Sequence, residues 1–338
     1  MKVSSYLIFG GKIMSRRRKD EHIAIAKMAK IRKNDFSHIR FIHHSIPSLS
    51  LKDIDLSTSF LEHKFNYPFY INAMTGGAKK GDKINAKLAI LAQHFGLPLF
   101  VGSQSLAFKN KESRLAFETL RFNFPDLFIV ANINPNFTAE MASDAVEILG
   151  ANALAIHVNS VQELVMGEGD RDFTKWKDNI ANILKTVKVP VIVKEVGYGM
   201  HEPTLLLLQE LGVKHIDISG MGGINFSLIE LKRQKKKDSP LLDFGISTVD
   251  ALLLARNYPN FEVLASGGIN NASSIVKSLA MGAKATGMAK YFLDLCNLPV
   301  PEMIKKVDEL IIDLKKILVL LNVKSVRELN LDHLMFDL

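Results

Sequence analysis

The feature of the sequence that most constrains the fold is a regular alternation of two kinds of segment. Short apolar runs rich in β-branched residues recur along the chain, and segments with apolar residues three and four positions apart follow them. The eight runs that we predict as strands are residues 68–73, 98–102, 127–132, 153–158, 190–195, 214–219, 261–267 and 285–288. The segments predicted as amphipathic helices include residues 82–95, 138–149, 173–187, 202–211, 247–257 and 272–281.

Strict alternation of eight strands with eight helices favours one α/β architecture. It is typical of a parallel sheet closed into a (β/α)₈ barrel, the TIM-barrel class, whereas a doubly wound sheet usually has fewer repeats. With 47% hydrophobic residues in a chain of 338, there is enough apolar material for such a core, which excludes intrinsic disorder. We therefore predict a TIM barrel over residues 68–338 and an N-terminal extension, residues 1–67, without a comparable core.

One connection of the predicted barrel is unusually long. The starts of the sixth and seventh predicted strands are 47 residues apart, so residues 220–246 are predicted as an inserted loop. The loop contains Gly222, Gly223 and a basic run that ends at Pro240. This is typical of a mobile lid over the barrel mouth, and a disordered surface loop is the alternative interpretation.

The charge of the chain restricts its partners. The 43 Lys and Arg residues exceed the 35 Asp and Glu residues, which gives a net charge of +8 and favours anionic partners. Much of the excess lies in residues 16–19 and 232–237, where a solvated surface is the simpler interpretation. Aromatic residues do not alternate with these basic ones, so nucleic acid is not expected as a partner.

The single cysteine and the lack of a long apolar segment indicate the compartment. Cys296 has no second cysteine with which to form an internal disulfide, which is typical of a reducing environment. The apolar run near the N-terminus is too short for a signal peptide, and Lys315 and Lys316 interrupt a long apolar segment. We therefore expect a cytoplasmic protein that does not cross a membrane, with Met14 as an alternative start to Met1.

Polar residues and glycines collect where the predicted strands end. In barrels of this class, the carboxyl ends of the strands and the loops after them carry the functional residues. Glycines follow the seventh strand in residues 266–269 and the eighth in residues 287–289. Such glycines expose backbone N–H groups at a helix N-terminus, which favours a phosphate site, and plain turn geometry is the alternative. A site of this kind serves FMN as well as unrelated phosphorylated substrates, so it does not name its ligand.

A second group of candidate residues follows the fourth predicted strand. His157, Asn159, Gln162 and Glu163 lie within seven residues, and one carboxylate beside neutral amides suits Mg²⁺. A helix-capping carboxylate and a packed barrel histidine are the structural alternatives. Lys194, near the end of the fifth strand, is placed to meet a phosphate or an electron-rich ring, unless it forms a salt bridge with the next residue or a neighbouring strand.

Across nearly the whole chain, these residues resemble a known family, the type 2, flavin-dependent isopentenyl-diphosphate isomerases. Seven motifs that carry the match occur in order along the chain. They are residues 18–22 (RKDEH), 72–77 (NAMTGG), the 157–163 cluster, 194–197 (KEVG), 219–223 (SGMGG), 243–246 (DFGI) and 266–269 (SGGI). Seven ordered motifs are hard to obtain by chance, and the barrel prediction agrees with them independently.

The resemblance implies an isomerase of isoprenoid biosynthesis that shifts the double bond of isopentenyl diphosphate to give dimethylallyl diphosphate. It implies reduced FMN, Mg²⁺ and NADPH as the reductant, with no net redox change. Carried over by position, it assigns to the substrate Arg18, Lys19, His22, Ser103, Ser105 and Gln162, and to Mg²⁺ Glu163. It assigns to FMN Met74, Thr75, Gly76, Ser103, Asn132, Lys194, Ser219, Gly267, Gly268, Met288 and Ala289. The catalytic residues that it implies are Gln162, His157 and Asn159.

The chemistry of this reaction explains why a flavin would serve in it. Protonation of an unactivated alkene gives a tertiary carbocation with no heteroatom to delocalise its charge, so stabilisation must come from outside the substrate. We hypothesise that reduced FMN is the acid and base, with Gln162 positioning or relaying the proton.

Because Arg18 and Lys19 precede the barrel, we expect them to reach across a subunit boundary in a homo-oligomer, a tetramer or an octamer.

Three residues depart from the family pattern. Ile224 stands where many members have Thr, Asn270 where an Arg is common, and Ser105 where some members have an Arg near the diphosphate. Each change is expected to weaken the binding of flavin or substrate rather than to change the reaction.

Two other functions stay as alternatives: an FMN-dependent oxidoreductase of the 2-hydroxy-acid oxidase type, and a barrel that binds phosphate or nucleic acid without catalysis.

Overall fold

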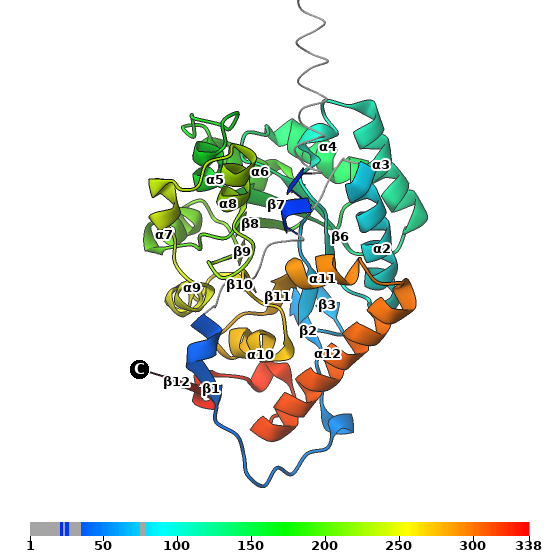
Figure 1. Ribbon diagram of the computed structural model, residues 1–338, viewed down its shortest axis with the longest axis vertical. Coiled ribbons are helices and arrows are strands. Elements are labelled where there is room, and N and C mark those ends of the chain that lie inside the picture. The colour runs from blue at the N-terminus through cyan, green and yellow to red at the C-terminus, as the bar shows by residue number, and fades with distance from the viewer. Residues whose placement is uncertain (1–20, 23, 27–34, 75–78, 338) are drawn as a thin grey trace, which may run out of the picture.

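The structure, a computed structural model, describes residues 21–22, 24–26, 35–74 and 79–337. Its centre is a closed barrel of eight parallel strands, in the spatial order β10, β11, β4, β5, β6, β7, β8, β9 (Figure 1). The strands are β4 (Phe69–Ile71), β5 (Leu99–Phe100), β6 (Ile129–Ile133), β7 (Ala153–Val158), β8 (Val191–Glu195), β9 (His215–Asp217), β10 (Glu262–Ser266) and β11 (Ala285–Met288). Each of them overlaps one predicted run, so the prediction of a TIM barrel is confirmed.

Helices follow the strands and surround the barrel (Figure 1). They are α2 (Lys79–Phe95), α3 (Lys111–Asn123), α4 (Ala139–Leu149), α5 (Ser160–Val165), α6 (Trp176–Thr186), α7 (Glu202–Glu210), α8 (Phe226–Arg233), α9 (Thr248–Ala255), α10 (Ala272–Ala280), α11 (Lys290–Leu295) and α12 (Val300–Leu321). Several begin at a polar residue that accepts a hydrogen bond from the first turn, as Thr138, Ser247 and Asn271 do. The six predicted helices are confirmed to within three residues at each end.

Shorter elements complete the described chain. The antiparallel pairs are β1 (Ile39–Phe41) with β12 (Leu334–Phe336), and β2 (Thr58–Phe60) with β3 (His63–Phe65). The 3₁₀ helices are η1 (Asp35–His38), η2 (Leu51–Asp53), η3 (Gln104–Leu106), η4 (Pro240–Asp243), η5 (Val326–Glu328) and η6 (Leu331–His333). Lys277 of α10 donates a hydrogen bond to the carbonyl of Phe36 at 2.9 Å, which ties the start of the chain to the barrel wall.

The core has two layers because alternate strand residues point to opposite faces of the sheet. Outward residues such as Phe69 and Ile71 pack against the helices, whereas Tyr70 and Phe100 fill the barrel interior. The hairpin of β2 and β3 adds Phe60, which is fully buried, to this inner layer. Burial of a side chain of this size stabilises the fold by roughly 1.5–3 kcal/mol. The hairpin lies beside the amino ends of the strands, so it closes that end of the barrel.

The insertion between β9 and β10 contains a helix, which corrects the prediction that residues 220–246 form a loop. Asn225 caps α8 through a hydrogen bond from the backbone N–H of Leu228, and Ile229 and Leu231 are buried. The helix packs against α5, and Gln234 donates a hydrogen bond to the carbonyl of Val165 at 2.7 Å. These contacts exclude the alternative of a disordered surface loop.

No helix in the described part of the chain combines the length and the apolar surface that a membrane span needs.

Candidate active site

Two adjoining pockets open at the carboxyl ends of the barrel strands. The glycine pocket, as we name the first, is lined chiefly by residues at the ends of β4 and β8 to β11 and just after them, among them Gly223, Gly267, Gly268, Gly287 and Ala289. The amide pocket is lined chiefly by residues that follow β5 to β8, among them Asn132, Asn134, Asn159 and Gln162. The two pockets share the lining residues His22, Ala73, Met74, Lys194, Val196 and Phe226. Two ligands in contact would therefore fit side by side.

Glycines form a tightly backed cradle in the glycine pocket. Gly267 has a φ of +94°, and a Cβ there would lie 2.1 Å from the carbonyl oxygen of Gly220. A Cβ on Gly223 would lie 2.9 Å from the backbone nitrogen of Gly268. The carbonyl of Gly267 accepts a hydrogen bond from the Thr248 hydroxyl at 2.7 Å, which fixes the loop just before the cap of α10. Only glycine fits this close approach of two loops.

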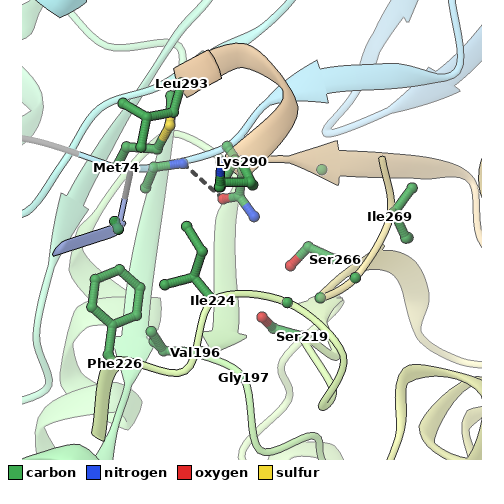
Figure 2. Close-up of a pocket in the computed structure, with 18 of the residues that line it drawn as sticks. Met74, Val196, Gly197, Ser219, Ile224, Phe226, Ser266, Ile269, Lys290 and Leu293 are labelled. Carbon is green, nitrogen blue, oxygen red and sulfur yellow. Dashed lines mark hydrogen bonds between the residues drawn. The ribbon is translucent and has the colours of Figure 1, made fainter. Parts of the chain in front are cut away.

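Apolar side chains cover the rest of the glycine pocket. Figure 2 shows Ile224 and Phe226, from the insertion, on one side of the pocket and Met74 and Leu293 on the opposite side. The glycine cradle thus lies at one edge of a mainly apolar space. A ligand with a flat apolar body would fit between the apolar walls, and an anionic group at its end would fit the glycine cradle.

A neighbouring strand holds His157 in one orientation. Asn132 donates a hydrogen bond through Nδ2 to the carbonyl of Val101 at 3.0 Å, so its Oδ1 is the acceptor that faces Nδ1 of His157 at 2.8 Å. His157 therefore donates this hydrogen bond through Nδ1.

Asn159, Gln162 and Glu163 form one hydrogen-bonded group at the start of α5. Nδ2 of Asn159 donates to Oε1 of Glu163 at 2.9 Å and to Oε1 of Gln162 at 3.3 Å. The backbone N–H of Asp170 donates to the other carboxylate oxygen of Glu163 at 3.0 Å. Oδ1 of Asn159 is buried and has no hydrogen-bond partner among the described residues. A buried acceptor of this kind needs a partner, and a polar ligand in the amide pocket would supply one.

Lys194 lies between the two pockets and has a carboxylate partner. Its Nζ donates to the carbonyl of Glu195 at 2.9 Å and lies 3.8 Å from Oδ2 of Asp217 on β9. The alternative of a salt bridge with a neighbouring strand is therefore what the structure shows, although Lys194 also lines both pockets.

Glu195 organises the loop that follows β8. Its Oε2 accepts hydrogen bonds from the backbone N–H groups of Val196, Tyr198 and Gly199. Burial raises the pKa of Glu195 to about 8, against the opposing effect of these N–H groups and of Lys194. The loop held in this way places Val196 in both pockets and Gly197 in the glycine pocket.

The insertion and the N-terminal segment meet beside both pockets. Nε2 of His22 lies 2.5 Å from Oε1 of Glu230, which is fully buried on α8. Arg233 bonds to Glu230 and also to Glu21 at 3.1 Å and Glu168 at 3.2 Å. These ion pairs join the N-terminal segment, the insertion and the loop after α5 at the mouth of the barrel.

The structure brings most of the predicted site residues together. Those that line one or both pockets are His22, Met74, Ser103, Ser105, Asn132, His157, Asn159, Gln162, Glu163, Lys194, Ser219, Gly267, Gly268 and Ala289. Met288 does not line a pocket, since its side chain is fully buried in the core. Arg18, Lys19, Thr75 and Gly76 lie outside the described residues.

The three departures from the family pattern lie in different places. Ile224 lines the glycine pocket, so its apolar side chain faces the ligand space. Ser105 lines the amide pocket, and its hydroxyl lies 2.9 Å from that of Ser103. Asn270 lines neither pocket, and its Oδ1 accepts a hydrogen bond from Asn271 at 2.9 Å.

Several residues of the site were not predicted from the sequence. Lys109 and Phe226 line the amide pocket, and Asp217 pairs with Lys194 beneath it. Lys109 follows the second predicted strand by seven residues, so extending the search further along each loop would have found it. Asp217 is an acidic residue between Ile216 and Ile218 in a predicted strand, which was the available signal.

Comparisons with known proteins agree with this geometry. The profile of the FMN-dependent dehydrogenase family matches residues 111–335. The isopentenyl-diphosphate delta-isomerase of Staphylococcus aureus is 43% identical over 324 residues, which cover 95% of this chain and 93% of that protein. The protein of that name from the S. aureus strain JH9 has the same identity and coverage.

Solved structures with the same fold share far less sequence. A flavocytochrome b2 variant with sulfite bound has a TM-score of 0.66 and 19% identity, covering 93% of this chain and 82% of that one. An oxidised active mutant of (S)-mandelate dehydrogenase has a TM-score of 0.67 and 16% identity, covering 96% and 99%. The fold and the site thus define a barrel of the FMN-dependent dehydrogenase class. Within that class, the chain belongs to the isopentenyl-diphosphate delta-isomerase family.

Proposed function

We propose that this chain converts isopentenyl diphosphate to dimethylallyl diphosphate, with FMN as its cofactor. The observation that carries the proposal is the pair of adjoining pockets, which share Met74, Lys194 and Val196. One pocket has a glycine cradle and apolar walls, and the other has amides and a carboxylate. A flavin in the first and a diphosphate ester in the second would contact each other across the shared residues.

The glycine pocket fits FMN. Gly223, Gly267 and Gly268 would hold the phosphate, because a Cβ at either of the first two would clash with the neighbouring loop. Met74, Ile224 and Leu293 would contact the ring, with Lys194 at its edge. When bound in its reduced form, the flavin supplies an exchangeable proton and negative charge close to the alkene.

The amide pocket would hold the alkene and its diphosphate. Gln162 and Asn159 are neutral, so they orient the hydrocarbon part and a proton without adding a charge that would compete with the cationic transition state. His157, fixed by Asn132, would line the same space. Ser103 and Ser105 would donate hydrogen bonds to the substrate, as the resemblance implies.

The diphosphate needs cations, and the N-terminal segment would provide some of them. We propose that Arg18, Lys19 and His22 bind it, which gives residues 1–67 a part in the site of the barrel over 68–338. Lys109 lines the amide pocket and has no side-chain partner among the described residues, so it would add a further positive charge. Binding of a phosphate group by several cations of this kind is strong and depends on salt.

Glu163 would hold Mg²⁺ against the diphosphate. No group of three or more His, Cys, Asp or Glu side chains with metal-ligand spacing occurs among the described residues. Mg²⁺ commonly takes one or two carboxylates and completes its shell with waters and substrate phosphates, which suits a single glutamate beside the amide pocket. The metal would then bind with the substrate rather than stay in the free protein.

We also propose NADPH as the reductant that provides reduced FMN, and a cytoplasmic homo-oligomer of four or eight copies. The resemblance to the isomerase family supports these points.

An anaerobic assay tests the proposed function. Purified protein is incubated with isopentenyl diphosphate, FMN, Mg²⁺ and NADPH, and with mixtures that each lack one component. We expect dimethylallyl diphosphate only when FMN and reductant are present, with no net consumption of NADPH per turnover. A protein that holds flavin but yields no product would contradict the proposal. Oxidation of a 2-hydroxy acid by the same protein would instead establish the alternative.

A further inference from the structure

Four buried polar side chains meet inside the barrel, below the two pockets. They come from four different strands: Tyr70 from β4, Lys194 from β8, Asp217 from β9 and Ser266 from β10. None has more than 5% of its surface exposed. Lys194 and Ser266 line the glycine pocket, whereas Tyr70 and Asp217 lie beneath it. The group therefore connects the barrel core to the floor of the cofactor pocket.

Asp217 is the centre of this group. Its Oδ2 accepts a hydrogen bond from the Tyr70 hydroxyl at 2.8 Å, and the Ser266 hydroxyl lies 2.8 and 2.9 Å from its two oxygens. The backbone N–H of Ser219 donates to Oδ1 at 3.2 Å. Nζ of Lys194 lies 3.8 Å from Oδ2 and supplies the positive charge that the buried carboxylate needs.

The barrel is shaped to admit Tyr70. A Cβ on Gly287 would lie 2.6 Å from the Tyr70 ring, so only glycine leaves room for the ring at that position. The neighbouring strand β5 provides Phe100, whose ring stacks on that of Tyr70 at a centroid distance of 4.5 Å. Burial, and then the charge of Asp217, raise the pKa of Tyr70 well above its usual value, so its hydroxyl stays a donor.

We propose that Asp217 is a positioning residue that acts through Lys194. It holds the lysine ammonium at the floor of the glycine pocket and partly offsets the positive charge that a bound flavin ring meets there. Tyr70 and Ser266 in turn hold the carboxylate. The inference rests on the flavin of the proposed function, and it assigns roles to Asp217 and Tyr70 that the sequence did not indicate.

The ion pair is tested first on protein without flavin, by a double-mutant cycle. Asp217→Asn, Lys194→Met and the double variant are unfolded in urea, and their midpoints are compared with that of the parent. Each single change leaves one buried group without its partner, whereas the double change removes both charges. We expect the double variant to unfold at a higher urea concentration than Asp217→Asn alone. Strictly additive effects would overturn the proposal.

The effect on the flavin is tested by binding. The dissociation constants of oxidised and of reduced FMN are measured for the parent and for Asp217→Asn. Without the carboxylate, the lysine charge is no longer offset, so the preference for reduced, anionic FMN should rise by roughly three- to tenfold. The reduction potential of the bound flavin should become more positive, by the difference that corresponds to this change in the ratio of the two dissociation constants. An unchanged ratio of the two dissociation constants would refute a role toward the flavin.

Tyr70→Phe is the matched control. It removes one hydrogen bond to Asp217 but no charge, so we expect a lower urea midpoint and an unchanged preference between the two flavin states. A shift as large as that of Asp217→Asn would show that packing, and not charge, produces the effect. None of these measurements uses isopentenyl diphosphate, so the inference can hold or fail independently of the proposed reaction.

Discussion

At the scale of single residues, Glu163 is the carboxylate that we assign to the metal. Replacing it by Gln keeps the size of the side chain but removes the charge that would bind Mg²⁺. For Glu163→Gln we expect kcat/KM to fall by roughly 10²–10³-fold and the Mg²⁺ concentration at half-maximal rate to rise. Mg²⁺ titrations of the conversion rate measure both effects, and an unchanged Mg²⁺ requirement would show that the metal binds elsewhere.

Lys109 is the residue whose charge we assign to the diphosphate. For Lys109→Ala we expect KM for isopentenyl diphosphate to rise roughly ten- to a hundredfold with kcat nearly unchanged, because a charge-assisted contact to a bound phosphate is worth about 1.5–3 kcal/mol. The affinity for FMN should not change. Lys111→Ala is the control, since Lys111 is an exposed residue two positions away that lines neither pocket. Equal effects of the two changes would mean that only the general charge of the surface matters.

The site could be predicted from the sequence where a residue lies at the end of a strand. His157, Asn159, Gln162 and Lys194 were found in this way, and the structure places all four at the pockets. The acidic residue Asp217 is visible in its predicted strand, but its pairing with Lys194 from a different strand is not. Nothing local indicates either that the side chain of Met288 turns into the core.

At the scale of elements, the loop after β10 depends on one backbone conformation. For Gly267→Ala we expect the affinity for FMN to fall tenfold or more, because the new Cβ would lie 2.1 Å from the Gly220 carbonyl oxygen in a residue with a φ of +94°. The strain should also lower the free energy of unfolding by about 1–3 kcal/mol. Flavin absorbance after gel filtration measures retention. Gly167→Ala, where a Cβ meets nothing within 4 Å, should retain flavin as the parent does.

The loop after β8 should make stability depend on pH. The pKa of Glu195 is raised from 4.5 to about 8 in the folded chain, so the folded state holds a proton that the unfolded state releases. The contribution of Glu195 to stability is therefore complete below pH 4.5 and is lost as the pH rises towards 8. Compared with Glu195→Gln, the parent should lose roughly 1.4 kcal/mol per pH unit across this range. Urea unfolding at pH 5, 6, 7 and 8 measures the difference, and parallel curves would contradict it.

Element prediction succeeded where apolar periodicity was strong and failed where it was weak. The six predicted helices bury one regular face against the barrel, and each is visible in the sequence alone. Helix α8 spans only eight residues within a basic segment, and its burial depends on contact with α5 and the N-terminal segment. A helix of this length gains most of its stability from such contacts.

At the scale of the whole molecule, the alternation of strands and helices was sufficient to predict the closed barrel, but not its floor. The hairpin of β2 and β3 fills the amino end of the barrel with side chains from the N-terminal extension, and nothing in its short strands indicates that position. Pairing of β1 with β12 joins residues almost 300 positions apart. Local patterns carry no information about contacts of that range.

The floor of the barrel should contribute much of the stability without affecting the pockets. Phe60 is fully buried there, so for Phe60→Ala we expect a loss of about 3–5 kcal/mol in the free energy of unfolding. The affinity for FMN should stay unchanged, because the glycine pocket lies at the opposite end. Urea unfolding and flavin titration measure the two quantities, and a loss below about 1 kcal/mol would show that the hairpin is dispensable.

The pairing of β1 with β12 also has a consequence for biosynthesis. Strand β1 leaves the ribosome early, yet its partner is made almost last, on the order of half a minute later at ordinary rates of translation. The final strand of the barrel, β11, is likewise needed before the pockets can close. Nascent chains would therefore hold an incomplete glycine pocket until Leu293 has been made, and a product truncated before β11 would lack part of that pocket.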